Sequence, residues 1–445
     1  MGTDIIALNV IETTIVALTM IWVMWTGRFE VGVALYIAFP LWTRTVLLVT
    51  VVQTWPILAA TIVGLVVYLF RTGRPISEMV PEKSRWIIPW MLCWWLWMLL
   101  ILQVFSVGDK RSFHRPIFLY VILPIPLVML FAHDIQRIRS FAVAFIATIF
   151  LGGWKTLESI QITLDYLVRD PTLSNTDIIR LGLGNYHWFS YGFSLSLIWI
   201  VWLFLQARRP WVMALLMVGA IISIYFMFMS GSRQSLNGGV FSAFVLVIWS
   251  MFQRSTPKLR TVLLTVAAVM IGITIYTVAP HLILRDNETD VTDSFDLLGD
   301  RGGLWAKSIE IFERSPIWGT GFEYAVYSHN FFLSALADQG IVGFIFQIGY
   351  TCFFFRRCRQ VWEGPGSMER ASLRAAMLAV GIFTMIHSQA SGNALSIFHF
   401  YWAGVILWWQ GQELEIASPK SNPIRDRVLA LRNARRAVAG EATPL

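Results

Sequence analysis

The sequence predicts an all-α polytopic membrane protein with about twelve transmembrane helices and one large outer loop. Hydrophobic residues make up 56% of the 445-residue chain and charged residues only 14%, whereas a soluble domain carries about 25% charged residues. So few charges cannot cover a chain of this size in water, and lipid must therefore face most of its surface. Apolar stretches that reach the length of a span, about 20 residues, recur along almost the whole chain.

The N-terminal region is almost continuously apolar and holds the first two predicted spans, near residues 5–26 and 46–70. Pro40 interrupts the stretch 31–43 between them, so we expect that stretch to be re-entrant or interfacial. Because the start of the chain carries acidic residues and no basic cluster, we do not expect a cleaved signal peptide.

Ten further spans follow, separated by polar or charged segments. We predict them near 86–106, 116–131, 140–157, 188–206, 211–229, 236–253, 261–279, 331–355, 375–392 and 396–413. The chain then divides into an N-terminal helix bundle of about nine spans (1–279), a periplasmic loop subdomain (280–330), three C-terminal spans (331–413) and a cytoplasmic basic tail (414–445).

The basic residues of the connecting segments set the predicted orientation. One side of the membrane receives about twice as many lysines and arginines as the other, and the tail belongs to the richer side. Since that side is normally the cytoplasm, the sequence predicts a multi-pass protein of a bacterial inner membrane with both termini in the cytoplasm. The net charge of +8 is then explained by membrane lipids as partners, and no nucleic-acid partner is expected.

The late outer segment, 280–330, combines an acidic run with a predicted amphipathic helix from Leu304 to Phe312. Apolar residues recur at helical spacing in that helix, and Pro316 ends it. The acidic run matches no standard metal-binding loop, so we predict no metal site and interpret the run as a solvated strand. The inner loops are too short for a soluble catalytic domain, so any chemistry belongs to the outer face or the membrane.

Arginines on the predicted outer side are the first candidate site residues. Arg233, followed by Gln234, lies in a short turn between two apolar spans, and Arg180 precedes the span that opens near residue 188. Arg301 follows the acidic run. A charge so close to hydrocarbon is costly unless it snorkels to headgroups or finds a partner. Snorkelling explains any one of them, but three on one face favour a shared anionic ligand.

The second candidate is the pair His329-Asn330, which stands where the outer loop enters the span 331–355. A histidine is well suited to abstract a proton near neutral pH, although a loop histidine bonded to the backbone is the commoner case. His187 is a weaker candidate near Arg180, at the mouth of a span. Three other histidines are interpreted as structural: His281, His387 and His399.

The ordered motifs from about residue 180 to 343 resemble those of the bacterial O-antigen ligase family. His329-Asn330 is followed after nine residues by Gly340 and then by Gly343. The residues before this pair resemble the family as well, in the order Arg180, Gly184-Asn185, Gly231-Ser232-Arg233-Gln234, Arg301, Trp305, Pro316, Gly319 and Gly321. One departure is Tyr186-His187, where many relatives have Pro-Asn.

The resemblance implies an inverting, metal-independent and cofactor-free glycosyltransferase with a GT-C-like membrane fold. Its donor would be a polysaccharide on undecaprenyl diphosphate, and its acceptor a sugar hydroxyl of the lipid A-core at the periplasmic face. In that reaction Arg180, Arg233 and Arg301 would bind the diphosphate, with His187, Gln234 and Asn330 as further substrate contacts. His329 would be the catalytic base.

Three other functions remain open at this point. An O-antigen polymerase and a protein O-oligosaccharyltransferase share the donor and differ in the acceptor. A transporter or flippase is the least favoured, because it predicts charged groups near the bilayer midplane in two related halves. The candidate charges here cluster at outer helix ends, and the sequence has no evident repeat.

Overall fold

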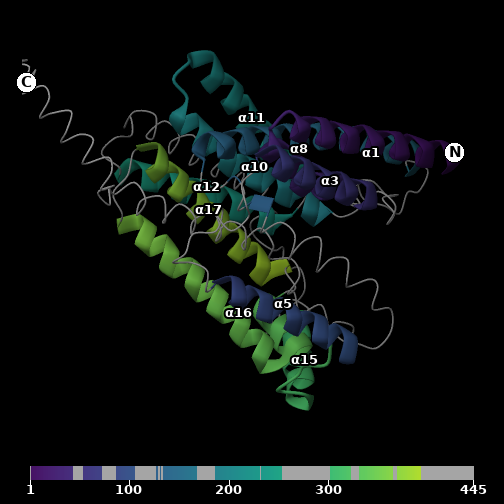
Figure 1. Cartoon of the computed structure of the whole chain (residues 1–445), viewed down its shortest axis with the longest axis vertical. Helices are drawn as coiled ribbons and strands as arrows, with labels where there is room; N and C mark the ends of the chain where they lie inside the picture. The colour runs from purple at the N-terminus through teal and green to yellow at the C-terminus, as the bar shows by residue number, and fades with distance from the viewer. Residues whose placement is uncertain are drawn as a thin grey trace, which may run out of the picture.

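Every element in the described part of the chain is an α-helix (Figure 1). The predicted all-helical class is confirmed there, whereas the total of twelve spans, the large outer loop and the division into four segments stay predictions. The computed structural model describes residues 2–43, 54–72, 87–105, 127–128, 131, 134–167, 186–230, 232–252, 301–321, 330–363 and 368–391.

The helices follow the apolar stretches of the sequence. In chain order they are α1 (Gly2–Trp25), α2 (Phe29–Thr43), α3 (Thr54–Thr72), α5 (Ile87–Val104), α8 (Ile135–Leu167), α10 (Tyr186–Gln206), α11 (Pro210–Met229), α12 (Arg233–Phe252), α15 (Arg301–Arg314), α16 (Phe331–Glu363) and α17 (Met368–Ser391). The predicted spans near 261–279 and 396–413 and most of 116–131 lie outside the described residues.

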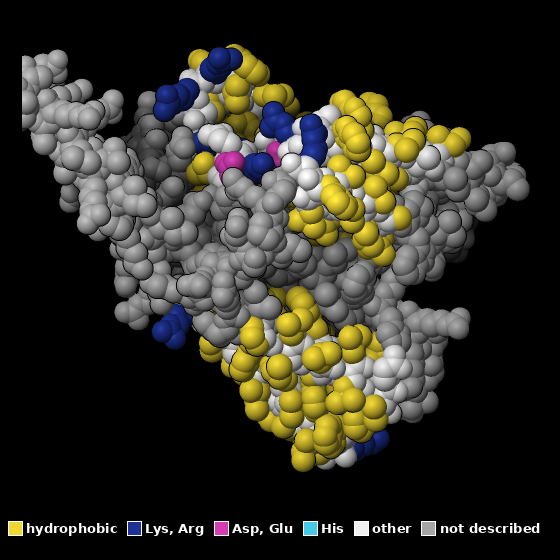
Figure 2. Space-filling view, viewed as in Figure 1, with side chains coloured by type: hydrophobic (Ala, Val, Ile, Leu, Met, Phe, Trp, Pro, Cys, Tyr) yellow, Lys and Arg dark blue, Asp and Glu magenta, His cyan; other side chains and the backbone are white. Residues whose placement is uncertain are grey.

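By length and composition, four of these helices are apolar enough to cross a membrane: α8, α10, α11 and α16. Their surroundings differ, since 89% of the apolar segment of α10 is buried but only 17% of that of α11. Helix α10 is therefore central and α11 peripheral, with Trp211, Leu215 and Val218 exposed on one face of α11. Figure 2 shows hydrophobic side chains over the face formed by α5, α15 and α16, as expected where lipid replaces water.

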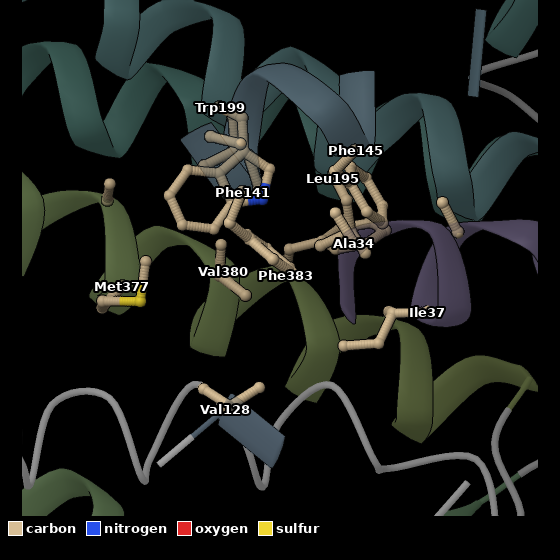
Figure 3. Packing of buried hydrophobic residues seen from close by; sticks show 14 of the residues in the cluster. Ala34, Ile37, Val128, Phe141, Phe145, Leu195, Trp199, Met377, Val380 and Phe383 are labelled. Carbon is tan, nitrogen blue, oxygen red and sulfur yellow. The ribbon is translucent and has the colours of Figure 1, made fainter. Parts of the chain in front are cut away.

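The core lies where α2, α8, α10 and α17 meet (Figure 3). Phe141 of α8 packs edge-on against Trp199 of α10, with ring centroids 6.1 Å apart. Helix α2 contributes Ala34 and Ile37, both buried. The stretch 31–43 is therefore part of a helix packed against α8, and its predicted re-entrant or interfacial placement in the membrane stays a prediction.

Helices α1 and α3 run in the same direction. The Arg71 guanidinium at the end of α3 donates to the Trp25 carbonyl at the end of α1, and Phe29 stacks on Tyr68 at 4.6 Å. The first residues of α1 therefore lie at the opposite end from Arg71. Helix α2 is a further helix between the two expected spans, and the predicted cytoplasmic side of both termini stays a prediction.

Helix α16 reverses direction at Gly340, whose φ of 65° and ψ of −168° are not helical. The Gln347 side-chain amide lies 3.5 Å from the carbonyl oxygen of Phe331, and the rings of Phe332 and Phe344 are 6.1 Å apart. In a straight helix the first pair would be separated by about 24 Å. Residues 331–339 therefore form a short arm that lies beside the long arm, 341–363, and we call the two the α16 hairpin.

Replacing Gly340 with alanine should destabilise the hairpin. A positive φ costs an L-residue about 1–2 kcal/mol, and a Cβ at this position would overlap the Ile317 carbonyl oxygen. We expect a lower thermal midpoint of the purified protein. Gly303→Ala is the matched control, because Gly303 has open space around it in α15 and alanine favours a helix. A midpoint equal to that of wild type in Gly340→Ala would contradict the reversal.

Candidate functional site

The N-terminal ends of α10 and α12 and the C-terminal end of α17 meet at one end of the bundle. Helix α11 runs antiparallel to α10, since Phe193 stacks on Phe226 at 4.6 Å and α12 begins at the turn where α11 ends. Helix α17 is antiparallel to α10, because Tyr191 contacts His387 at one end and Gln206 donates to Ser372 at the other. We call the end near Tyr191 and His387 the polar end.

Small residues hold α10 and α12 close together just below this polar end. The Ser194 hydroxyl donates to the carbonyl oxygens of Ser190 and Ser235, at 2.9 and 2.8 Å. A Cβ at Gly239 would lie 2.8 Å from the Ser194 Cβ, so only glycine allows this approach. Such small-residue contacts are typical of helices packed in membranes. They fix the start of α12 beside the start of α10.

This packing brings together some of the predicted site residues. His187 is in the first turn of α10, and Arg233 and Gln234 open α12, so their backbones lie at the same end. Gln234 is half-buried. Arg301 is the first residue of α15, in the group of α5, α15 and α16, which contacts the rest of the bundle through α16 and α17. The positive ends of the α10 and α12 dipoles meet at the polar end, which favours an anion.

The structure leaves part of the predicted site undescribed. Arg180 and His329 lie outside the described residues, as do the side chains of His187, Arg233 and Arg301. Their proposed roles therefore stay predictions. The acidic run before Arg301 lies outside as well, and the described residues contain no group of three His, Cys, Asp or Glu that could hold a metal ion.

Asn330 caps the short arm of the α16 hairpin. Its Oδ1 accepts hydrogen bonds from the backbone N–H groups of Phe332 and Leu333, at 3.0 and 3.1 Å. Its carbonyl oxygen accepts the Ser334 N–H at 2.9 Å. Asparagine is among the best N-cap residues because it satisfies donors that the first turn leaves free. The side chain therefore fixes the direction in which the chain enters the arm, one residue after His329.

The reversal sets Asn330 beside the long arm of α16 rather than at the far end of one straight helix. Phe331 lies beside Gln347, seven residues beyond Gly340, which corresponds to about 10 Å along the long arm. At this level the long arm exposes apolar side chains, Ile345 and Ile348. The sequence predicts this junction at the end of a single straight span, whereas Asn330 lies beside a part of the long arm that exposes apolar side chains.

A segment after α15 closes the tip of the α16 hairpin. Thr320 and Gly321 donate backbone hydrogen bonds to the carbonyls of Ala337 and Asp338, both at 3.0 Å. The Ile341 N–H donates to the Pro316 carbonyl at 2.8 Å. We call residues 316–321 the clamp. It supplies partners for backbone groups that the break in the helix leaves free, which the interior of a membrane requires.

The glycines of the sequence motif have a structural role in this clamp. Gly319 and Gly321 have φ values of 74° and 85°, which favour glycine. A Cβ on Gly319 would overlap the backbone of Asp338, and one on Gly340 would overlap that of Ile317. The motif residues Pro316, Gly319, Gly321 and Gly340 therefore belong to one contact, in which the backbone of the clamp lies against the backbone at the tip of the hairpin.

The sequence analysis did not identify a polar cluster that lies between α10 and α17 at the polar end. Tyr191 of α10 contacts Thr384 and His387 of α17: its hydroxyl lies 3.4 Å from the Thr384 hydroxyl, and its ring centroid lies 4.5 Å from that of His387. All three side chains are buried. His387 had been interpreted as structural because a lone histidine in an apolar stretch gives no signal of the tyrosine that the fold brings to it.

These features define a multi-pass membrane protein with a polar site at one end of its helices. Residues 218–348 match the family model described as O-antigen ligase. The predicted resemblance to this family is thus confirmed over the region that contains the Arg233 turn, α15, the clamp and the tip of the α16 hairpin. No curated protein matched the chain.

Proposed function

We propose that this protein is an O-antigen ligase, a glycosyltransferase of the bacterial inner membrane. It transfers a polysaccharide from undecaprenyl diphosphate to a sugar hydroxyl of the lipid A-core, with inversion and without a metal ion. The observation that carries the proposal is the family match over residues 218–348, which includes both the Arg233 turn and the His329-Asn330 motif.

The donor's diphosphate is the anionic ligand of the proposed site. As the glycosidic bond breaks, its electron pair leaves with the diphosphate, whose growing charge must be neutralised. Arginine provides bidentate, charge-assisted hydrogen bonds to phosphate oxygens, and preorganised positive charge stabilises the transition state without a metal ion. We assign this role to Arg180, Arg233 and Arg301. The paired helix starts of α10 and α12 add to the positive potential.

The acceptor side of the reaction is assigned to His329. Its imidazole takes the proton from the acceptor hydroxyl while the hydroxyl oxygen attacks the anomeric carbon. The Asn330 cap supports this role, because it fixes the backbone next to the histidine. The position of Asn330 beside the apolar surface suits a donor whose carrier lipid stays in the outer leaflet.

The distribution of charge supports the proposed orientation. The ends of the helices opposite the polar end carry Arg139, which donates to Gln206 at 2.9 Å, and the pair Arg208-Arg209 precedes α11. Because arginines collect on the cytoplasmic side of inner-membrane proteins, we propose that this end faces the cytoplasm and the polar end the periplasm.

Reconstitution tests the reaction directly. Full-length protein in liposomes should transfer polysaccharide from undecaprenyl diphosphate to lipid A-core, and should do so equally well in excess EDTA. Extension of a second lipid-linked polysaccharide instead would identify a polymerase, and extension of an acceptor protein a protein-directed transferase. Activity that disappears with EDTA and returns with Mg²⁺ would contradict the metal-free mechanism.

Arg233→Ala should lower the rate of transfer or the affinity for the donor by roughly ten- to a hundredfold. This corresponds to about 1.5–3 kcal/mol for one hydrogen-bonded contact with a charged group. Arg233→Lys should restore only part of it, because lysine lacks the planar fork. Arg314→Ala is the control, since Arg314 is paired with Glu310 on an exposed face of α15. Equal activity of Arg233→Ala and wild type, at equal membrane levels, would sink the assignment.

His329→Ala should reduce turnover by about 10²–10⁴-fold and leave binding of undecaprenyl diphosphate nearly unchanged. In the wild type, turnover should fall as the pH drops through the ordinary histidine pKa, about 6.5, because a protonated imidazole cannot accept the acceptor's proton. If His329→Ala instead weakened only donor binding at unchanged saturated turnover, the base would have to be another residue.

A further inference from the structure

Three tryptophans of α5 form one face that is directed at the α16 hairpin. Trp90, Trp94 and Trp97 recur at the i, i+4, i+7 spacing that aligns side chains on one side of a helix. The indole N–H of Trp90 donates to the Phe346 carbonyl at 3.3 Å. The other two indoles reach the tip of the hairpin, where both bind Gln339.

Gln339 is the last residue of the short arm before the reversal. Its side-chain Oε1 accepts the Trp94 N–H at 3.1 Å, and its backbone carbonyl accepts the Trp97 N–H at 3.1 Å. Gln339 is completely buried, so each of these acceptors would be left unsatisfied in an apolar interior if its donor were removed. The two indoles therefore fix both the side chain and the backbone of this residue.

The clamp is anchored on the same helix. Trp318 stacks on Trp97 and on Phe105, with ring centroids 5.3 and 5.7 Å apart. Trp97 and Phe105 are separated by about 12 Å along α5, so Trp318 is inserted between them. Helix α5 thus holds both the clamp and the end of the short arm.

The short arm connects this anchor to the proposed base. It runs from Asn330 to Gln339, about 13 Å, and near its Asn330 end the Gln347 side-chain amide lies 3.5 Å from the Phe331 carbonyl oxygen. Any shift of Gln339 about the pivot at Gly340 is therefore transmitted to Asn330. Arg233, one of the arginines proposed to bind the donor, opens α12 and is not part of this arm, so we expect its contact with the donor to be unaffected by a shift of the arm.

From this arrangement we infer that Trp94 and Trp97 are positioning residues for the His329-Asn330 pair and act through Gln339. The inference rests on the proposed transferase function, because it assigns these tryptophans to the alignment of its base. They touch neither donor nor acceptor. Their effect is to keep the base at the distance from the acceptor hydroxyl that proton transfer requires.

The test is the double variant Trp94→Phe/Trp97→Phe, which removes both N–H donors and keeps the rings, including the stack on Trp318. We expect turnover to fall about ten- to a hundredfold, the size of effect that a displacement of about 1 Å produces, with the donor KM within about twofold of wild type. Trp95→Phe is the matched control, since the Trp95 N–H has no hydrogen-bond partner among the described residues. If the double variant does not accumulate in membranes, the single variant Trp97→Phe gives the same comparison.

A second readout does not depend on activity. Ser334 is buried on the short arm. In a background with Cys93, Cys352 and Cys358 replaced by serine, Ser334→Cys should react with a maleimide at least about threefold faster in the double variant, because the arm opens locally. The Trp95→Phe control should leave the rate unchanged.

The outcomes separate the two proposals. A wild type without transferase activity overturns the proposed function, whatever the labelling shows. Equal turnover in the double variant and Trp95→Phe, in an active wild type, overturns the positioning role. A donor KM that rises together with the loss of turnover also overturns it, because a general loss of structure would affect both.

Discussion

A backbone polar group inside a membrane has no water to bind, so each must find a partner within the protein. The reversal at Gly340 breaks the helical hydrogen bonds of α16 and frees the carbonyls of residues 337–339. The clamp satisfies two of these carbonyls, and the Trp97 indole satisfies the third. The α16 hairpin, the clamp and α5 therefore form one unit, in which each part supplies hydrogen-bond or stacking partners to another.

Much of the fold follows from hydropathy because apolar stretches of span length become helices in lipid. Hydropathy gives the length of an apolar stretch but not the direction of the chain within it. The stretch 331–355 therefore predicts one straight span, whereas the φ of Gly340 and the contacts between the two arms show that it folds back. Hydropathy also says nothing about packing partners, and this applies to α2. The sequence predicts its residues 31–43 as re-entrant or interfacial because Pro40 interrupts them. Its burial depends on α8, more than a hundred residues away in the sequence.

The candidate site was predictable where a residue acts through its neighbours in sequence. Asn330 stands directly before a predicted span, and its side chain caps the first turn of the helix that begins there. The motif glycines were recognised, but their reason was not, because Gly319 and Gly340 matter through each other's backbone. The cluster of Tyr191, Thr384 and His387 gave no signal in the sequence. Tyr191 is almost two hundred residues from the other two, and each residue alone resembles an ordinary core residue.

The distance in sequence between α5 and its partner has a consequence for biosynthesis. The Trp94 indole and Gln339 are 245 residues apart, which a ribosome takes about 12–50 s to synthesise at 5–20 residues per second. Throughout this interval the tryptophan face of α5 exists without its acceptors in α16. The unit formed by α5, the clamp and the α16 hairpin can therefore be completed only after α16 has been synthesised.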